Sequence, residues 1–182
     1  MKEVQLNTFV NKWYNPGNPL KRGVWYFFNI IFFKSYLFPF YSFKRFLLRM
    51  WGANIGKGVV IKPGVNIKYP WTLSIGDFSW IGEKVWIDNL ADVTIGKNVC
   101  ISQGAFLLTG NHDFTLTTFD LIVKPISIAD GAWIGARTVV CPGTTIESHA
   151  ILTVGSIAIG QLKAFTIYRG NPAMPEKKRI LT

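Results

Sequence analysis

Residues 109–125, TGNHDFTLTTFDLIVKP, include His112, one of only two histidines in the chain. An imidazole has an ordinary pKa of about 6.5, so it can take a proton from a hydroxyl near neutral pH. A hydroxyl activated in this way can attack an activated carbonyl. His112 is therefore the candidate general base, and the neighbouring Asp113 is a candidate to orient it or to bind substrate.

Metal chemistry and disulfide chemistry are not predicted. Cys100 and Cys141 form no CxxC pair, and the chain is large enough to fold without a disulfide. We expect both thiols to be reduced and buried, because free cysteine is among the most buried residue types. A three-histidine zinc site would need one histidine more than His112 and His149 provide.

The positive charge is concentrated at the two ends of the chain. The formal net charge is +10, of which residues 1–50 carry +7 and residues 161–182 carry +4, while residues 51–160 carry −1. Basic ends suit anionic partners such as cofactor phosphates or a lipid surface. No nucleic-acid-binding motif accompanies this charge, so we do not expect a nucleic-acid partner.

Residues 24–43, VWYFFNIIFFKSYLFPFYSF, form an aromatic and apolar segment with basic residues on both sides. Three interpretations remain open: a helical element packed on the domain, an interfacial amphipathic helix, or a membrane span. Lys34 and Pro39 argue against a span, while aromatic groups beside Lys and Arg favour an interface. The first residues lack the apolar run of a signal peptide, so we expect a cytoplasmic protein, with residues 24–50 able to contact the membrane peripherally.

An aliphatic residue recurs every six positions from residue 55 onward, with shifts between runs. The sixteen positions are Ile55, Ile61, Ile67, Leu73, Ile75, Ile81, Ile87, Val93, Ile95, Ile101, Leu107, Ile128, Ile134, Val140, Ile146 and Leu152. A period of six fits neither an amphipathic helix nor a simple hairpin meander. It fits a chain that turns a corner every six residues, so that three units close one triangular coil.

The residues around these positions support the same coil. A small or β-branched residue stands four positions after most of them, as at Val59, Ala105 and Thr138, and would fill a corner. Glycine often follows directly, and we expect it to supply turn conformations that a Cβ would resist; examples are Gly56, Gly76, Gly82, Gly96 and Gly135. The prediction is an all-β parallel β-helix over residues 51–160, an N-terminal helical segment over 1–50, and a C-terminal basic tail over 161–182.

The stretches WIGEKVWIDN, VCISQG, TGNHDF, VKPISIADGAWIGA and YRGNPA resemble the hexapeptide-repeat acyltransferases. Within that family the resemblance is greatest to the colanic acid biosynthesis acetyltransferases and the maltose and galactoside O-acetyltransferases. It covers roughly residues 51–175. It implies a left-handed β-helix, acetyl-CoA as co-substrate, a saccharide or glycolipid acceptor, a homotrimer with sites between neighbouring prisms, and His112 as general base in an active-site loop at about residues 109–125.

The resemblance also implies further site residues. Asp88 and Asn89 fall near the family's acceptor-binding region. Positions that match the family's coenzyme A groove are Trp133, Gly135, Ala136, Val154, Gly155 and Ser156. Ile159 and Gly160 replace a Thr and a phosphate-binding Lys of relatives, so Lys163 or Arg169 is expected to supply that charge.

Two other functions remain open on the sequence alone. The aromatic N-terminal segment suits a non-catalytic, membrane-associated scaffold, although a histidine in the interrupting loop favours an enzyme. Transfer of an acyl group to the amine of a nucleotide sugar is the alternative within the enzyme class. The sequence predicts an acetyl-CoA-dependent O-acetyltransferase that acts in exopolysaccharide or cell-surface glycan biosynthesis.

Overall fold

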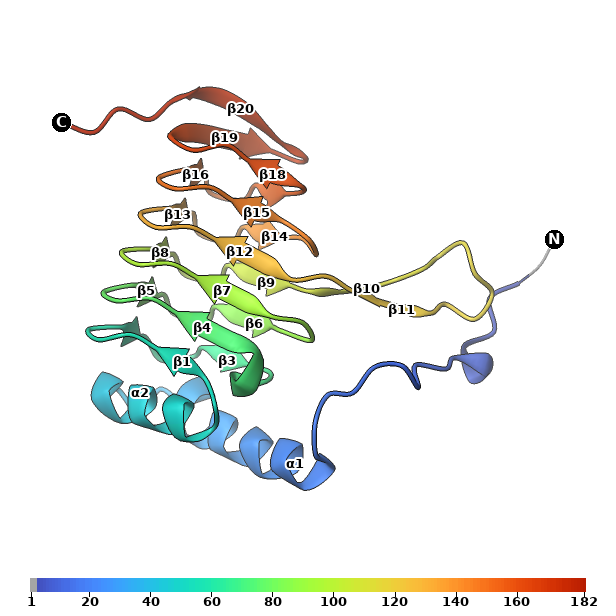
Figure 1. Cartoon of the computed structure of the whole chain (residues 1–182). Helices are drawn as coiled ribbons and strands as arrows, with labels where there is room; N and C mark the ends of the chain where they lie inside the picture. Colours follow the sequence, from blue (N-terminus) through green and yellow to red (C-terminus); the bar gives the residue numbers. More distant parts are fainter. Residues whose placement is uncertain (1–2) are drawn as a thin grey trace.

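The computed structural model describes residues 3–182, which form a triangular solenoid with helices at one end (Figure 1). Each coil passes through three parallel sheets in turn. Within residues 3–182, sheet A contains β1 (Asn54–Ile55), β4 (Leu73–Ile75), β7 (Val93–Ile95), β12 (Ile126–Ile128), β15 (Thr145–Ile146) and β18 (Gln161–Leu162). Sheet B contains β2 (Val60–Ile61), β5 (Trp80–Ile81), β8 (Cys100–Ile101), β13 (Trp133–Ile134), β16 (Ile151–Leu152), β19 (Thr166–Gly170) and β20 (Ala173–Lys178). Sheet C contains β3 (Asn66–Ile67), β6 (Trp86–Asp88), β9 (Phe106–Leu108), β14 (Val139–Val140) and β17 (Ile157–Ala158).

The six-residue period is confirmed as the pattern of the core. Each of the sixteen aliphatic positions is buried, with at most 5% of its surface exposed. Corner positions such as Val59, Ala105 and Thr138 are also buried. Equivalent residues of successive coils stand in register, as Ile75 pairs with Ile95, so the aliphatic side chains form continuous columns inside the prism. The predicted all-β parallel β-helix with an N-terminal helical segment is confirmed.

The glycines that follow the aliphatic positions have a different purpose from the one predicted. None of them has a positive φ; that conformation occurs later in the turn, for example at Gly58 and Lys84. A Cβ on Gly56 would lie 2.5 Å from the backbone nitrogen of Asp77, and one on Gly76 would lie 2.6 Å from the backbone of the next coil. These glycines are required because neighbouring coils approach closely.

The outward-facing ladders differ between the three sheets. Sheet A presents polar side chains in register, namely Asn54, Ser74, Thr94, Ser127, Thr145 and Gln161. Sheet B presents Val60, Trp80, Cys100, Trp133, Ile151 and Ile167, and sheet C presents Asn66, Trp86, Phe106, Val139 and Ile157. One face of the prism is therefore suited to water, whereas two are largely apolar.

The thiols Cys100 and Cys141 are half-buried rather than fully buried.

The N-terminal segment covers the first coil, as Figure 1 shows below β1. It consists of η1 (Leu6–Thr8), α1 (Pro19–Phe28), the π-helical η2 (Asn29–Lys34) and α2 (Tyr41–Met50). Helix α1 begins at an N-cap, since the Asn18 side chain accepts hydrogen bonds from the backbone of Leu20 and Lys21. Trp25 and Phe33 are buried against the core, and the Trp25 indole donates to the Ile67 carbonyl at 2.9 Å. A further short helix, η3 (Pro70–Thr72), lies in the corner after β3.

Three basic residues of α2 stabilise the open edge of the solenoid. The Arg49 guanidinium donates to the carbonyls of Ile55 and Gly56 at 2.9 Å, and Arg45 donates to Val59 at 2.8 Å. The buried Lys44 ammonium lies 3.3–3.4 Å from two further carbonyls of the first coil. The first coil has no preceding coil to satisfy these groups, so the cations replace it. Part of the basic charge at the N-terminal end is therefore used inside the fold and not for an anionic partner.

The C-terminal segment extends the solenoid beyond residue 160, where a tail was expected. β18 pairs with β15, and β19 pairs with β16. β20 then folds back antiparallel on β19 and covers the last edge of sheet B. Among residues 3–182, none of the helices combines the length and the apolar character that crossing a bilayer requires.

Candidate active site

The segment that interrupts the repeat forms a hairpin projecting from the prism, drawn in yellow in Figure 1. Its strands are β10 (Gly110–His112) and β11 (Leu121–Val123), paired antiparallel with His112 opposite Leu121. The N-terminal segment supports the tip of the hairpin, since the Gln5 amide donates to the Thr117 carbonyl at 2.8 Å. The hairpin leaves the solenoid after β9 of sheet C and returns at β12 of sheet A, so it stands at the corner between these sheets.

The hairpin holds the His112 imidazole in one orientation. Nδ1 lies 2.8 Å from the Phe119 carbonyl oxygen. A carbonyl can only accept, so Nδ1 carries a proton, and in the neutral imidazole the lone pair is therefore on Nε2. The ring stacks on the Phe119 ring at 4.4 Å with 9° between the planes, and Phe9 contacts it at 5.7 Å. The arrangement leaves Nε2 as the basic atom of this site.

Asp113 is placed differently from His112. Its Oδ1 accepts hydrogen bonds from the backbone and the hydroxyl of Thr115, at 2.9 and 2.6 Å. These hydrogen bonds lower the pKa of the Asp113 carboxyl. The side chain thus closes a turn of the hairpin, and the orientation of the imidazole comes from Phe119. The contact of His112 with the Phe119 carbonyl depends on how the hairpin turns, and the types of the residues do not predict it.

Asp88 and Asn89 are both close to the corner from which the hairpin leaves. The Asp88 carboxylate forms an ion pair with Lys68 at 2.8 Å, and its backbone carbonyl accepts from the Thr109 hydroxyl at 2.8 Å. Asn89 is fully buried, and its amide bonds to the backbone of Tyr69 and to the Thr72 hydroxyl. Asn89 therefore stabilises the corner, whereas Asp88 lines a surface hollow.

Five of the eight residues expected to bind the cofactor line one groove of about 510 Å³. They are Trp133, Gly135, Ala136, Val154 and Arg169. The groove also includes Ser102, whose hydroxyl accepts from the Trp133 indole at 2.9 Å, and Gln103. Both belong to the coil below; sequence reasoning missed them, although the register of the repeat places Cys100 beside Trp133. The lining of the groove is partly apolar and includes one guanidinium, that of Arg169.

The other three expected cofactor residues do not line this groove. Gly155 occupies a turn with φ 68°. Ser156 is buried, and its hydroxyl bonds to the backbone of Gly170 and the hydroxyl of Thr153. Lys163 lines a separate hollow near Lys178 and pairs with Glu147 at 3.3 Å. Arg169, which pairs with Glu176 at 3.3 Å, is therefore the cation at the groove.

The hairpin and the groove lie on opposite sides of one prism. The groove occupies sheet B and the turns that lead from sheet B to sheet C. The hairpin stands at the corner between sheets C and A, which is the corner opposite sheet B in a triangle. His112 of one copy is thus separated by the core from the groove of the same copy.

The second histidine takes no part in this arrangement. His149 stacks on Phe165 at 4.7 Å in a turn near the C-terminal end, and its backbone carbonyl accepts from Arg179 at 3.1 Å. Within residues 3–182, no group of three His, Cys, Asp or Glu side chains is arranged to hold a metal ion.

Comparison with known proteins gives the family. No family model matches the chain. The chain is 37% identical over 173 residues to a protein of Escherichia coli named "Putative colanic acid biosynthesis acetyltransferase WcaF", with 95% of each chain covered. It belongs to the hexapeptide-repeat acetyltransferases.

Two further relatives agree with this family. The galactoside O-acetyltransferase of Escherichia coli is 28% identical over 132 residues, which cover 71% of this chain and 65% of that protein. The hexapeptide-repeat acetyltransferase VCA0836 of Vibrio cholerae, solved in complex with acetyl coenzyme A, has the same fold. It matches with a TM-score of 0.80 and 23% identity over 87% of each chain. The expected family and an acetyltransferase activity are thereby confirmed.

Proposed function

We propose that this acetyltransferase transfers an acetyl group from acetyl-CoA to a hydroxyl of a saccharide. The observation that carries the proposal is the anchored imidazole of His112, whose Nδ1 is held by the Phe119 carbonyl while Nε2 is basic. A hydroxyl needs such a base to become a nucleophile at neutral pH. An amine acceptor, as in the alternative N-acyl transfer, is a nucleophile once it is neutral and depends less on a base.

The reaction takes one proton from the acceptor hydroxyl and returns one proton to the departing thiolate. Nε2 of His112 removes the hydroxyl proton as the oxygen attacks the thioester carbonyl, and the tetrahedral intermediate then breaks its carbon–sulfur bond. The protonated Nε2 returns the proton to the departing thiolate, so the imidazole ends neutral. The Phe119 carbonyl stabilises the imidazolium because it accepts from Nδ1 throughout.

We assign the groove on sheet B to coenzyme A. Its partly apolar lining and the polar side chains of Ser102 and Gln103 suit a pantetheine chain, which carries two amides. Trp133 is 46% exposed and provides an apolar wall. Gly160 stands where relatives have a phosphate-binding lysine, so Arg169 is the candidate for contact with a phosphate of coenzyme A.

The active site is proposed to form between copies in a homotrimer. His112 and the groove lie on opposite sides of one prism, so neither can reach the other within one chain. The two apolar faces, sheets B and C, provide surfaces to pack around a threefold axis, while polar sheet A remains in water. The projecting hairpin would then bring His112 to the groove of the next copy.

The base is tested with acetyl-CoA, a panel of saccharides and a thiol reagent. We expect His112→Asn to lower kcat by about 10²–10⁴-fold, the range for loss of a general base. His149→Asn is the matched control, because it removes the other histidine at a turn whose φ of 58° asparagine tolerates. Equal rates for the two variants would refute the assignment, provided that acetyl-CoA still binds to both.

We further propose that the protein works at the cytoplasmic face of a membrane, on a glycan precursor. In α1 and η2 the exposed residues Leu20, Val24, Phe27 and Ile31 recur at spacings of four, three and four, opposite the buried Trp25. Phe46 and Met50 of α2 are also exposed. A helical surface of this composition, flanked by lysine and arginine, suits the headgroup region of an anionic bilayer.

Vesicle sedimentation tests this contact. Wild-type protein should sediment with phosphatidylglycerol vesicles at low salt, and the double variant Phe27→Ser, Ile31→Ser should not. Ile180→Ser is the control, because this equally apolar residue is 84% exposed in the C-terminal segment. Full recovery of the wild type in the supernatant would refute the membrane contact without affecting the catalytic proposal.

A further inference from the structure

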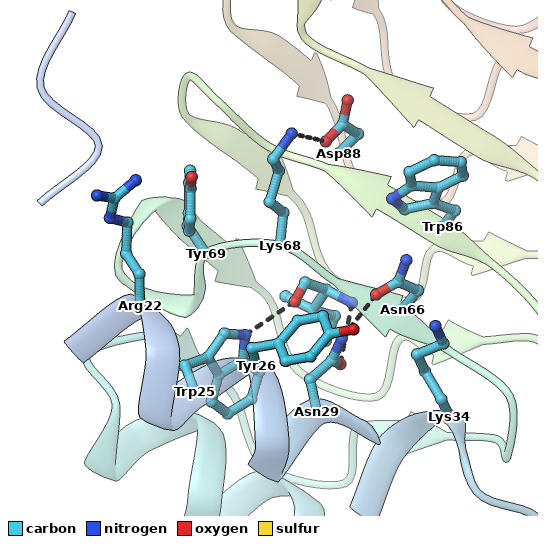
Figure 2. A pocket seen from close by; sticks show the side chains of 11 residues that line it. Arg22, Trp25, Tyr26, Asn29, Lys34, Asn66, Lys68, Tyr69, Trp86 and Asp88 are labelled. Atoms are coloured by element: carbon cyan, nitrogen blue, oxygen red, sulfur yellow. Dashed lines mark hydrogen bonds and ion pairs between the residues drawn. The ribbon is translucent and has the colours of Figure 1, made fainter. Parts of the chain in front are cut away.

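A hollow of about 330 Å³ lies between the N-terminal helices and the first coils, below the hairpin corner (Figure 2). Its lower wall comes from α1 and η2, and its upper wall comes from β3, β6 and the corner after β3. The lining residues are Arg22, Trp25, Tyr26, Asn29, Lys34, Asn66, Ile67, Lys68, Tyr69, Trp86 and Asp88. The donor groove on sheet B shares none of these residues.

The hollow carries an excess of positive charge. Three cations line it, Arg22, Lys34 and Lys68, against the single carboxylate of Asp88. Asp88 already pairs with Lys68 at 2.8 Å. The Nε of Arg22 is buried and has no hydrogen-bond partner within residues 3–182. A buried guanidinium nitrogen without an acceptor is costly, so a ligand that supplies an oxyanion here would satisfy it.

This charge differs from the basic charge of α2. Lys44, Arg45 and Arg49 are directed at backbone carbonyls of the first coil and are satisfied by them. Arg22 and Lys34 line the hollow, and Figure 2 shows them on opposite sides of it, with Lys68 above. The cations that line the hollow are therefore not needed to satisfy the free backbone carbonyls at the open edge of the first coil.

Aromatic side chains supply the remainder of the lining. Trp86 is 44% exposed and is held in place by stacking on Phe106 at 4.6 Å. Tyr26 is 59% exposed and stands at the mouth (Figure 2). A rigid indole face beside polar groups suits a ring that has an apolar face of C–H groups and hydroxyls around its edge, as a pyranose has. Asn66 and Asn29 add amide groups at the base.

The hollow and the hairpin share one corner of the prism. The carbonyl of Asp88 accepts from the Thr109 hydroxyl, one residue before the hairpin begins. The Tyr14 hydroxyl donates to the Leu90 carbonyl at 2.9 Å, and burial, then Tyr69 and Asp88, raise the pKa of Tyr14. The N-terminal segment that carries Tyr14 also places Phe9 against His112. The hollow therefore lies on the His112 side of the chain.

We propose that this hollow binds the acceptor, and that the acceptor is an anionic saccharide. Its ring would lie on Trp86, and its phosphate or carboxylate would be held by the cation on the side of the hollow that it faces, Arg22 or Lys34, with Lys68 released in part from Asp88. The inference rests on the proposed transfer to a saccharide and adds the charge of that saccharide. The shared chemistry is an oxyanion attached to a sugar, whether a sugar phosphate or a uronic acid.

Binding measured by ligand-observed NMR tests the proposal without turnover. The probes are glucose 1-phosphate, glucuronic acid, glucose and inorganic phosphate. We expect both anionic sugars, or one of them, to bind more tightly than glucose and phosphate, and the tighter one identifies the source of the oxyanion. One of the two variants Arg22→Gln and Lys34→Gln should weaken that binding by about tenfold, because it removes the charge-assisted contact, and that variant locates the oxyanion. Trp86→Leu should weaken binding of the sugar more than binding of phosphate.

Lys97→Gln is the matched control, since it removes one exposed positive charge from a corner remote from the hollow. If neither Arg22→Gln nor Lys34→Gln weakened binding more than Lys97→Gln does, the result would indicate only general attraction of anions and would overturn the proposal. Absence of binding for both anionic sugars would also overturn it. Acetyl-CoA binding, measured on the same samples, separates this failure from a failure of the proposed function, because the groove shares no residue with the hollow.

Discussion

Mixing two inactive variants of this acetyltransferase is expected to restore activity. His112→Asn removes the base but leaves the groove intact. Ala136→Trp fills the groove of about 510 Å³ with an indole but leaves the hairpin intact. Because the hairpin corner is opposite the groove-bearing sheet, each working site should take its base from one copy and its groove from the next.

The geometry sets the magnitude of the recovery. In a random equal mixture, a site works only if its groove belongs to a His112→Asn copy and its base belongs to an Ala136→Trp copy. For a closed ring of copies this occurs at about one site in four, whatever the number of copies. Each variant mixed with wild type should instead keep about one half of the sites. A double variant mixed equally with wild type should keep about one quarter, because only neighbouring wild-type copies form a site.

The assay is thiol release from acetyl-CoA after co-expression of the two variants at equal levels with the same tag, so that purification keeps mixed and unmixed assemblies alike. Acetyl-CoA binding to each variant alone confirms that only Ala136→Trp has lost the groove. Mixed assemblies with no activity above that of the separate variants would refute the shared site. Base and groove would then have to meet within one chain, and the positions derived for the hairpin and sheet B could not describe the active enzyme.

Three further outcomes are expected. Arg49→Met should lower the free energy of unfolding by about 2 kcal/mol, because two carbonyls of the first coil lose a charged donor; urea denaturation measures this loss, and Lys97→Met should cost little. Burial lowers the pKa of Lys44 to about 8, below its value in the unfolded chain, so the unfolded state binds more protons and stability should rise between pH 8 and about pH 10.4. Thermal unfolding of Lys44→Met should lack that rise, and equal pH curves would contradict the assignment. Asp113→Ala should lower kcat by less than about tenfold, and Asp113→Asn less still because its oxygen can still accept from Thr115; a loss as large as that of His112→Asn would mean that Asp113 acts directly.

The fold could be predicted because the repeat is local. An aliphatic side chain every six residues has one way to be buried, namely in columns such as Ile75 over Ile95, and every predicted position is in fact buried. The period did not reveal why glycine follows the aliphatic residue. The distance between neighbouring coils decides it, because a Cβ at Gly56 would overlap the backbone of Asp77 in the next coil.

Candidate site residues could be predicted by type, but their partners could not. His112 was expected from its position in the interrupting segment, whereas its contact with the Phe119 carbonyl depends on the turn of the hairpin. Asn89 was expected to meet substrate, yet it is buried and hydrogen-bonded to the backbone of Tyr69. The difference arises because residue type sets what a side chain can bond to, while the backbone around it sets which partner is within reach.

The sequence by itself determined the coil, the interruption at residues 109–125 and the histidine within it, because each follows from residue types at fixed spacings. The tertiary structure decided which cations are used by the fold and which line a hollow. Arg22 and Arg49 are equivalent in a count of charge, but Arg49 meets carbonyls at the open edge of the first coil, whereas Arg22 lines the hollow and its Nε is buried without an acceptor in the described chain. That distinction depends on where a helix is packed against a sheet edge, and no local pattern encodes it.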